Sequence, residues 1–251
     1  MFKEKKVAVV MPAYNAAKTI ARTYQEIIDQ KIVDVIIIVD DASNDGTVEI
    51  ASQLRSDETK TIIQVHEKNL GYGGNQKTCY RLALAEGADI VILIHPDYQY
   101  TPKLISAMVG MITCGLYSCV LASRVLGGAA LSGGMPFWKY VINKLLTTIE
   151  NFILGSNLSE YHTGYRAFSR ELLQKIHFES NSNDFIFDNE IILQILWYNY
   201  SIGEISCPTN YFPDASVINF WSSMKYGFGC ISIALIYRFA KMRLIKSRVF
   251  Y

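Results

Sequence analysis

Residues 33–47 have the sequence VDVIIIVDDASNDGT, and its two halves indicate the fold class of this chain. Its first half is a short, continuous run of mostly β-branched residues, which is typical of a parallel strand buried on both faces. Its second half, Asp40 to Gly46, is rich in Asp, Asn, Ser and Gly and is predicted to be a loop. Residues 47–55 then have helical spacing, so the stretch predicts a strand, a loop and a helix.

The same succession of elements continues on both sides of this stretch. The predicted strands cover residues 6–11, 33–39, 61–65 and 90–94, and the predicted helices cover residues 19–29, 47–55 and 76–86. Residues 69–75 are rich in glycine and are predicted to form a loop before the third helix. Strands that alternate with helices indicate parallel, right-handed βαβ units. The sequence therefore predicts an α/β fold with a doubly wound, mostly parallel sheet and helices on both faces.

The second half of the chain follows a different pattern. Four glycines between residues 127 and 134 indicate a loop, and residues 137–154 are predicted to form a long, largely apolar helix. This half is expected to extend the sheet rather than to form an independent domain. We divide the chain into a main domain, residues 1–216, and a C-terminal helical, basic extension, residues 217–251.

Composition excludes several classes of protein. With 251 residues, 50% of them hydrophobic, and a net charge of +1, the chain can bury a sizeable core and is not a disordered protein. The five cysteines are an odd number without metal-ligand spacing, which excludes a disulfide scaffold and is typical of buried thiols in a reducing compartment. The sequence has no internal repeat of the length found in solenoids and propellers.

Positive charge is concentrated in the C-terminal extension. From Ala215 to Tyr251 the sequence has six basic residues and no acidic residue, whereas the remainder carries a net charge of −5. Aromatic and aliphatic residues alternate with these cations, and a basic, apolar helix is typical of a segment on an anionic membrane surface. A helix that docks on the core and a contact within a homo-oligomer remain as alternatives. Nucleic acid is not expected as a partner, because no binding motif accompanies the basic residues.

No targeting or membrane-spanning segment is predicted. Residues 1–10 hold only a short apolar run before Pro12, which indicates a strand rather than a signal peptide. No window reaches the roughly 18–20 apolar residues of a spanning helix. The longest candidate, residues 226–237, ends at Arg238. We therefore expect a cytoplasmic protein, which the basic extension would hold peripherally on the inner face of the membrane.

Polar residues follow each of the four predicted strands. They are Pro12 to Asn15, Asp40 and Asp41, Gly71 to Gln76, and His95 to Gln99. In open α/β sheets, ligands bind outside the carboxyl ends of the strands, so these clusters are expected to form one site. The first turn lacks the glycines of G-x-G-x-x-G, and the chain lacks the Walker pattern. These absences disfavour a Rossmann dehydrogenase and exclude a P-loop NTPase.

His95, Asp97 and Gln99 are spaced two residues apart after the fourth strand. In an extended segment such residues face the same side, where an imidazole, a carboxylate and an amide oxygen could hold Mg²⁺ or Mn²⁺. The cation would neutralise the charge that develops on a departing diphosphate. A polar turn ended by Pro96 is the simpler explanation of the same residues.

Several motifs, in this order, resemble the family 2 glycosyltransferases of the GT-A fold, and most closely their branch that is similar to dolichol-phosphate mannose synthase. The motifs are VAVVMPAYNAAKTI (7–20), IIIVDDASNDGT (36–47), NLGYGG (69–74), ILIHPDYQYTP (92–102), Ser123-Arg124, TGYR (163–166), FIFDNEIILQI (185–195) and IGEISCPTNYF (202–212). The resemblance covers about residues 5–216, which is most of the chain.

The resemblance implies a nucleotide-diphosphate sugar as donor and inversion at its anomeric carbon. The residues that would bind this donor are Pro12, Ala13, Tyr14, Asn15, Asp40, Asp41, Gly71, Gly74, Asn75, His95, Asp97 and Arg124. An aspartate at position 40 or 41 would bind the base or, alternatively, cap the following helix. Asp97 matches the second acidic residue of the family's D-x-D metal motif, and His95 replaces the first. Because imidazole can bind Mn²⁺, that ion is preferred to Mg²⁺.

Two further departures from the family pattern concern Ala16 and Val217. Ala16 replaces the glutamate of P-x-Y-N-E, and Val217 follows Ser216 where the lipid-phosphate branch has Ser-Lys. The second departure removes a cation that is expected near an acceptor phosphate. The remaining candidates are Arg124 and Arg166 for holding phosphate and His162 for contacting the acceptor.

An inverting transfer to a hydroxyl acceptor requires a carboxylate base. Asp188 and Glu190 lie where the family places such a group, and Asp97 is a third candidate catalytic residue through the metal. Residues i and i+2 at a helix start cannot face the same way, so at most one of Asp188 and Glu190 is the base. Alternatively, both acids only oppose the helix macrodipole. A phosphate acceptor is already ionised and needs no strong base.

These observations favour a metal-dependent inverting glycosyltransferase of the hexosyltransferase type. Its acceptor would be a lipid-linked polyprenyl phosphate or a cell-surface glycan. A nucleotidyltransferase is a second hypothesis, but residues 11–17 lack the Gly- and basic-rich loop that it would need. A non-catalytic protein of the same fold, which binds nucleotide-sugars or acts as a scaffold, is the third, and His95 and Ala16 are its best support.

Overall fold

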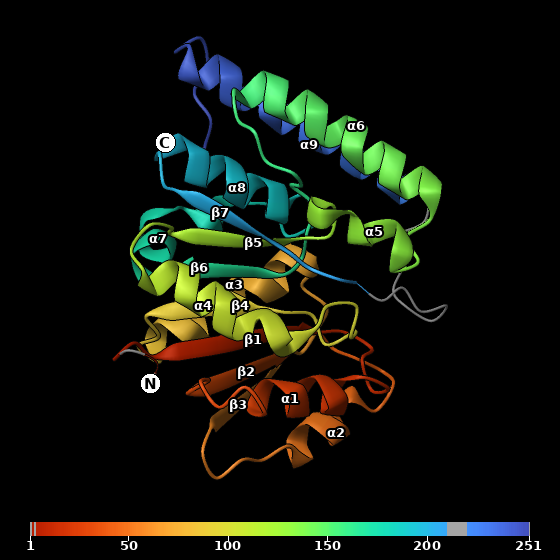
Figure 1. The fold of residues 1–251 in the computed structure, drawn as a ribbon, viewed down its shortest axis with the longest axis vertical. Helices are drawn as coiled ribbons and strands as arrows, with labels where there is room; N and C mark the ends of the chain where they lie inside the picture. Colours follow the sequence, from red (N-terminus) through yellow and green to blue (C-terminus); the bar gives the residue numbers. More distant parts are fainter. Residues whose placement is uncertain (1, 3, 210–219, 251) are drawn as a thin grey trace.

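The computed structural model of the chain describes residue 2, residues 4–209 and residues 220–250. In this part of the chain seven strands form one sheet, in the order β3-β2-β1-β4-β6-β5-β7 (Figure 1). The strands are β1 (Val7–Ala13), β2 (Val35–Asp40), β3 (Lys60–Val65), β4 (Ile90–Leu93), β5 (Cys119–Ser123), β6 (Arg166–Ser169) and β7 (Ile202–Ser206). All neighbouring pairs are parallel except those of β6, which is antiparallel to both β4 and β5. The predicted α/β, mostly parallel sheet is confirmed.

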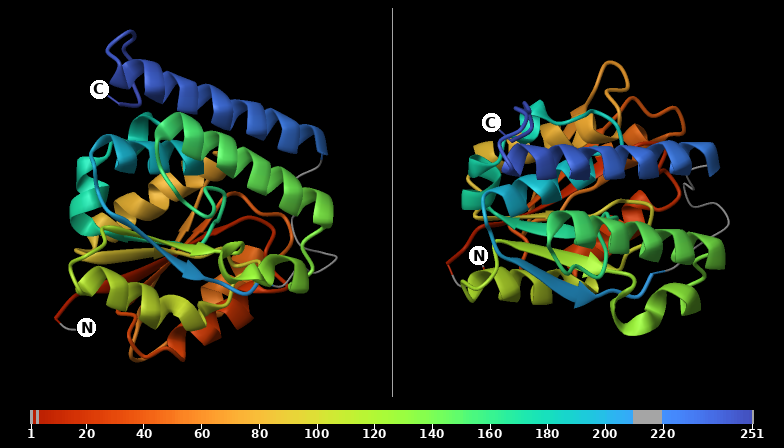
Figure 2. Two further views of the ribbon diagram at one scale, coloured as in Figure 1. Left: turned by 45° about the horizontal axis from the view of Figure 1, so that its top comes forward. Right: turned by 90° about the horizontal axis from the view of Figure 1, so that it is seen from above.

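Helices cover both faces of this sheet (Figures 1 and 2). They are α1 (Ile20–Ile28), α2 (Thr47–Gln53), α3 (Tyr72–Ala85), α4 (Ile105–Thr113), α5 (Ala129–Ser132), α6 (Phe137–Leu154), α7 (Arg170–Lys175), α8 (Phe187–Trp197) and α9 (Phe220–Lys241). Side chains of α1, α2 and α4 share one core with Ile36 and Ile38 of β2. Side chains of α3, α7 and α8 share the other core with Ile37 and Val39. Because successive strand residues point to opposite faces, the continuous apolar run of β2 supplies both cores.

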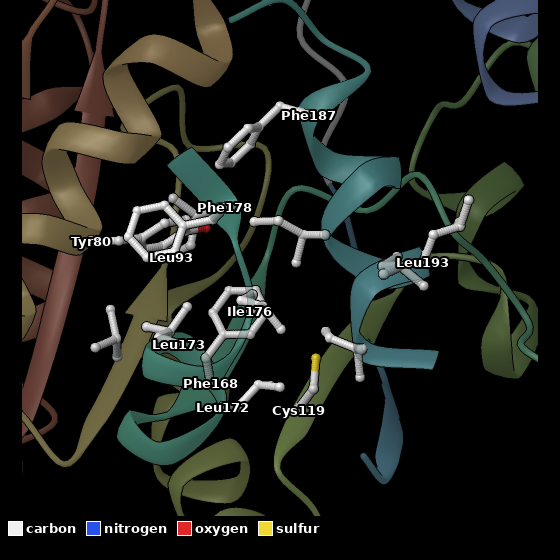
Figure 3. Packing of buried hydrophobic residues seen from close by; sticks show 14 of the residues in the cluster. Tyr80, Leu93, Cys119, Phe168, Leu172, Leu173, Ile176, Phe178, Phe187 and Leu193 are labelled. Atoms are coloured by element: carbon white, nitrogen blue, oxygen red, sulfur yellow. The ribbon is translucent and has the colours of Figure 1, made fainter. Parts of the chain in front are cut away.

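The core beside α3 and α8 fixes the helices that carry site residues. Figure 3 shows Tyr80 of α3 packed near Phe168, Phe178 and Phe187. The centroid of the Tyr80 ring lies 5.7 Å from that of Phe168 and 6.2 Å from that of Phe187. Aromatic packing of this kind adds to the free energy of burial. It holds the N-terminal ends of α3 and α8 at the carboxyl edge of the sheet.

Helix α3 begins earlier than the sequence predicted. Residues 69–75 were expected to be a loop, but the helix starts at Tyr72 and includes Gly73 and Gly74. A Cβ atom on Gly73 would lie 2.5 Å from the carbonyl oxygen of Ser182 and 2.7 Å from Cβ of Phe187. The glycine is therefore needed because the segment before α8 packs directly against the first turn of α3, and not because the chain turns there.

Strand β1 extends two residues further than predicted, through Pro12 to Ala13. Only Val7 to Val10 pair with β4, so Pro12 lies beyond the end of that neighbour and pairs on the β2 side, opposite Val39. A proline has no backbone N–H to donate, and this position needs none on the β4 side.

The long helix at residues 137–154 is confirmed with the predicted bounds as α6. Helix α9 lies beside it along one edge of the molecule (Figures 1 and 2). One face of α9 is buried, and Ile233, Ala234 and Tyr237 join the core with α8. The predicted domain boundary at residues 216 and 217 lies outside the described residues. Within the described part of the chain, no helix combines the length and apolar character that crossing a membrane requires.

Candidate active site

A cleft of about 1170 Å³ opens at the carboxyl ends of β1, β2 and β4 and continues to α6 and α9. Most of the predicted site residues line it, as expected for polar turns that meet at one edge of a parallel sheet. The predicted residues in the lining are Pro12, Ala13, Tyr14, Asn15, Asp41, Gly71, Asn75, His95, Asp97, Gln99, Arg124, His162 and Asp188. The predicted residues outside the lining are Asp40, Gly74, Arg166 and Glu190.

The turn after β1 is held by the loop after β2. Asn15 has a positive φ of 50° and its backbone N–H donates to Ser43 Oγ at 2.8 Å. Its side-chain Oδ1 accepts from the backbone N–H of Asn44 at 3.0 Å, and Ala16 N–H donates to Thr47 Oγ1 at 2.8 Å. These bonds fix the turn and leave the Tyr14 ring 53% exposed at the mouth of the cleft. An exposed aromatic ring in a fixed turn can stack on a nucleotide base.

Asp40 and Asp41 have different surroundings. Asp41 lines the cleft, and its carboxylate accepts from the backbone N–H groups of Leu70 and Gly71 and contacts His66 Nδ1 at 2.8 Å. It thereby fixes the segment before α3. Asp40 is fully buried, with one oxygen bonded to Ser43 N–H and the other without a partner among the described residues. Neither aspartate caps α2, which begins after Gly46 without a side-chain cap.

The segment from His95 to Gln99 is not extended, so the alternation argument for it was wrong. The chain turns at residues 96 and 97 and bends at 98 and 99, where Tyr98 has a φ of 60°. His95, Asp97 and Gln99 nevertheless all line the cleft, because the turn itself points into it. The alternative interpretation of these residues, a polar turn at Pro96, therefore describes the backbone correctly.

His95 takes part in a hydrogen-bonded chain with Tyr72 and Asp188. The Tyr72 hydroxyl donates to Asp188 Oδ2 at 2.7 Å and lies 2.9 Å from His95 Nε2. Because the single hydroxyl proton is given to the carboxylate, His95 Nε2 is the donor in the second bond, which leaves the lone pair on Nδ1. Burial, with the charge of Asp188, raises the pKa of Tyr72 well above its usual value, so the phenol keeps its proton. Tyr72 lies in the cluster Gly71 to Gln76 that was expected at the site, but no role was predicted for its hydroxyl, because residues 69–75 were expected to be a loop.

Asp188 and Glu190 point to different places, as their spacing predicted. Asp188 lines the cleft, accepts from Gln76 Nε2 at 3.1 Å and lies 3.6 Å from Arg166 Nη1. Glu190 is outside the cleft, and its Oε2 accepts from the backbone N–H of Ser182 at 2.6 Å. Burial raises the pKa of Glu190. Of the two acids, only Asp188 is placed to touch a substrate, so Glu190 is withdrawn as a catalytic candidate.

Arg166 cannot hold a phosphate in this structure. Its side chain is fully buried, and it donates to the carbonyl oxygens of Thr163 at 2.7 Å, Asp188 at 2.6 Å and Tyr161 at 3.0 Å. It is therefore a positioning residue that fixes the start of α8 beneath the cleft. Arg124 does line the cleft and forms an ion pair with the buried carboxylate of Glu160.

The other end of the cleft is formed by α6, α9 and the residues before β6. His162 Nδ1 lies 3.0 Å from the hydroxyl of Tyr226, the α9 residue in the lining. His162 Nε2 lies 3.1 Å from Oε2 of the fully buried Glu150, within ion-pair distance but not aligned as a hydrogen bond. Trp138 and Ile142 of α6 supply apolar lining beside these polar groups. Glu150 and Tyr226 were missed because no sequence motif marks either of them as a site residue.

The residues present fit a divalent cation in part. Within the described part of the chain, no group of three His, Cys, Asp or Glu side chains is assembled to hold a metal. Asp97 lines the cleft, and its Oδ1 accepts the backbone N–H of Gln99 at 3.0 Å. In the tautomer that donates from Nε2 to Tyr72, His95 carries its lone pair on Nδ1. A carboxylate and an imidazole are donor types that a divalent cation accepts, so these two residues could supply part of a ligand set.

Comparison with known proteins points to one family. The model of the family described as "Glycosyl transferase family 2" matches residues 8–177. A UDP-N-acetylglucosamine–dolichyl-phosphate N-acetylglucosaminyltransferase of Methanococcus voltae is 28% identical over 220 residues, which cover 83% of this chain and 87% of that protein. A polyprenol monophosphomannose synthase of Mycolicibacterium smegmatis is 23% identical over 199 residues, covering 78% and 74% of the two chains.

Solved structures agree on the fold. Glucosyl-3-phosphoglycerate synthase from Mycobacterium tuberculosis, in complex with phosphoglyceric acid, has a TM-score of 0.69 at 20% identity, covering 94% of this chain and 80% of that one. The same enzyme in complex with Mn²⁺, UDP and glucosyl-3-phosphoglycerate has a TM-score of 0.63 at 19% identity, covering 98% and 82%. The expected GT-A fold is thus confirmed, and with the match of the family model over residues 8–177, the chain belongs to glycosyl transferase family 2.

Proposed function

We propose that this family 2 glycosyltransferase moves a sugar from a nucleoside-diphosphate sugar to a polyprenyl phosphate, with inversion at the anomeric carbon. The observation that carries the proposal is that one cleft has two ends of different character. One end is formed by the polar turns after β1, β2 and β4. The other end is formed by the apolar side chains of Trp138 and Ile142 together with the basic side chains of Arg124 and Lys139. A nucleotide-sugar and a lipid phosphate need these two kinds of lining.

The polar end suits the donor. The exposed Tyr14 ring offers a stacking surface for the base, and Lys18 lines the same end with a cationic side chain that a diphosphate needs. Asp97 and His95 lie across the cleft at the end of β4 and would hold Mn²⁺ or Mg²⁺ together with the diphosphate. The cation would supply charge neutralisation for the leaving group.

The other end suits a lipid phosphate. Arg124 and Lys139 line it as cations, and burial, with the nearby charge of Arg124, lowers the pKa of Lys139. Together they compensate for the cation that Val217 removes relative to the lipid-phosphate branch. Trp138 and Ile142 offer apolar surface for the first isoprenoid units. The activities in the names of the two curated relatives, on dolichyl phosphate and polyprenol, support this acceptor class.

The transfer itself is a single displacement. An oxygen of the acceptor phosphate forms a bond to the anomeric carbon, and the bond from that carbon to the β-phosphate oxygen breaks. The nucleoside diphosphate leaves with the electron pair. A phosphate acceptor is already ionised, so no base must remove a proton. Asp188 and Tyr72 orient the His95 ring through the hydrogen bonds already in place. In this proposal the Asp188 carboxylate also contacts the donor sugar.

A release assay tests this function. Purified protein is incubated with UDP-sugars and GDP-sugars plus a short-chain polyprenyl phosphate, a soluble glycan or no acceptor, each with Mn²⁺ or with EDTA. We expect nucleoside diphosphate to be released with polyprenyl phosphate and Mn²⁺, and release to fall at least tenfold in EDTA. Release with the glycan alone would contradict the acceptor class. Donor binding without release under any condition would favour the non-catalytic alternative.

A further inference from the structure

Helix α6 turns an apolar face to the outside of the molecule. Six of its large hydrophobic side chains are exposed, and Phe152, at 89%, is the most exposed of them. With 100° per residue these six side chains fall within less than half of the helix circumference. The exposed members of this face are Phe137, Trp138, Val141, Ile142, Leu145 and Phe152.

Helix α9 has a similar outer face. Its buried side follows Cys230, Ile233 and Tyr237, and its exposed side carries a stripe at helical spacing. The exposed stripe consists of Met224, Phe228, Leu235, Phe239 and Met242, the last lying one residue beyond the helix. Leu244 and Ile245 continue the exposed apolar surface after it.

The two faces belong to neighbouring helices. α6 and α9 contact each other and run side by side in all three views (Figures 1 and 2). Scattered exposed hydrophobic residues are normal, but exposed apolar stripes along two neighbouring helices are more than scatter and mark an interaction site. Neither helix is long and apolar enough to cross a membrane, so the surface is suited to lying on a partner and not to spanning a bilayer.

The charges around this surface indicate the partner. The C-terminal part of the chain from residue 215 has six basic residues and no acidic one, and the single acidic residue of α6, Glu150, is fully buried. Arg238, Lys241, Arg243 and Lys246 are exposed. A second copy of the chain placed symmetrically on this surface would bring like charges together, whereas an anionic bilayer would complement them.

We propose that the outer face of α6 and α9 docks on an anionic membrane surface, with its apolar side chains in the headgroup region and its basic residues on the lipid phosphates. Trp138 and Ile142 belong to this face and also line the acceptor end of the cleft. Docking therefore places the cleft at the bilayer surface, where a lipid phosphate can enter without its chain leaving the membrane. Only this last step rests on the proposed function.

Vesicle co-sedimentation tests the docking, using vesicles of phosphatidylcholine with or without phosphatidylglycerol and with no polyprenyl phosphate. We expect the wild type to bind only the anionic vesicles, and less strongly at high salt. The variant Leu145→Ser/Phe152→Ser should bind at least tenfold more weakly, since two exposed apolar side chains are lost. Arg243→Gln/Lys246→Gln should lose about fivefold per charge removed. The control Leu116→Ser changes a 68% exposed side chain between α4 and β5 and should bind as the wild type does.

Three outcomes would overturn the docking proposal. They are absence of binding to anionic vesicles at low salt, equal weakening by Leu116→Ser, and a dimer by light scattering that Leu145→Ser/Phe152→Ser dissociates. Transfer to a short-chain acceptor in free solution should be unchanged in all three variants, because none of the five substituted residues lines the cleft. Vesicle binding without any transfer would refute the proposed function but not the docking. Transfer without vesicle binding would refute the docking but not the proposed function.

Discussion

Asp188 connects three segments of the cleft through its hydrogen bonds. Its carboxylate accepts from Tyr72 and Gln76, and its backbone carbonyl accepts from the buried Arg166. Through Tyr72 it also determines which nitrogen of His95 carries the proton. One side chain thus links the start of α3, the turn after β4 and the start of α8 within a single network.

The pair Asp188 and Glu190 offers a matched test at this scale. We expect Asp188→Asn to lower kcat by about 100-fold or more. This is the lower end of the range of effects found when a positioned acid–base group is removed. Glu190→Gln should stay within about threefold of wild type, because that side chain lies outside the cleft and the amide oxygen can still accept from Ser182. The measurement is steady-state kinetics with thermal unfolding as a control for folding. Equal losses in both variants would refute the assignment.

How far the site residues could be predicted follows from where they lie in the chain. Tyr14, Asn15, Asp41 and Asp97 come directly after strands, and the rule that ligands bind at the carboxyl ends of parallel strands was enough to bring them together. Arg166 was wrongly predicted to hold phosphate because a sequence does not reveal burial. A fully buried guanidinium must donate its N–H groups to nearby carbonyl oxygens.

The helices and strands that were predicted correctly are those whose ends are marked by nearby residues in the sequence. Helix α6 was predicted with its observed bounds, since Pro136 precedes it and Gly155, with a φ of 69°, ends it. The start of α3 was missed because Gly73 is required by close contact with Ser182 and Phe187, which lie more than 100 positions away in the sequence. Strand β6, antiparallel and four residues long, gave no alternation strong enough to detect.

Helix α9 is part of the core and not an appendage, which a pair of substitutions in one helix can show. Tyr237 is buried, with its ring centroid 5.8 Å from that of Trp197 and 5.5 Å from that of Phe250. Tyr237→Ala should lower the free energy of unfolding by about 3–5 kcal/mol. Phe239→Ala, on the exposed face, should change it by less than about 0.5 kcal/mol. Urea denaturation measures both, and a small loss for Tyr237→Ala would show that α9 does not pack as described.

At the scale of the whole molecule, the two kinds of chemistry are segregated. The sheet and its turns provide polar groups at one end of the cleft, while α6 and α9 provide an apolar, basic flank at the other. A net charge of +1 conceals this division, because the C-terminal segment is strongly basic and the remainder is acidic. An enzyme that joins a water-soluble donor to a lipid-bound acceptor requires such a division.

The anomeric configuration of the product distinguishes an inverting displacement from other routes of sugar transfer. The protein is given an α-linked nucleoside-diphosphate sugar and a short-chain polyprenyl phosphate, and the glycosyl phosphate that forms is examined by NMR. A single displacement at the cleft predicts a β-linked sugar phosphate. An α-linked product would contradict the inverting displacement, and failure to form any sugar–lipid phosphate, while nucleotide-sugar binds, would contradict the proposed transfer.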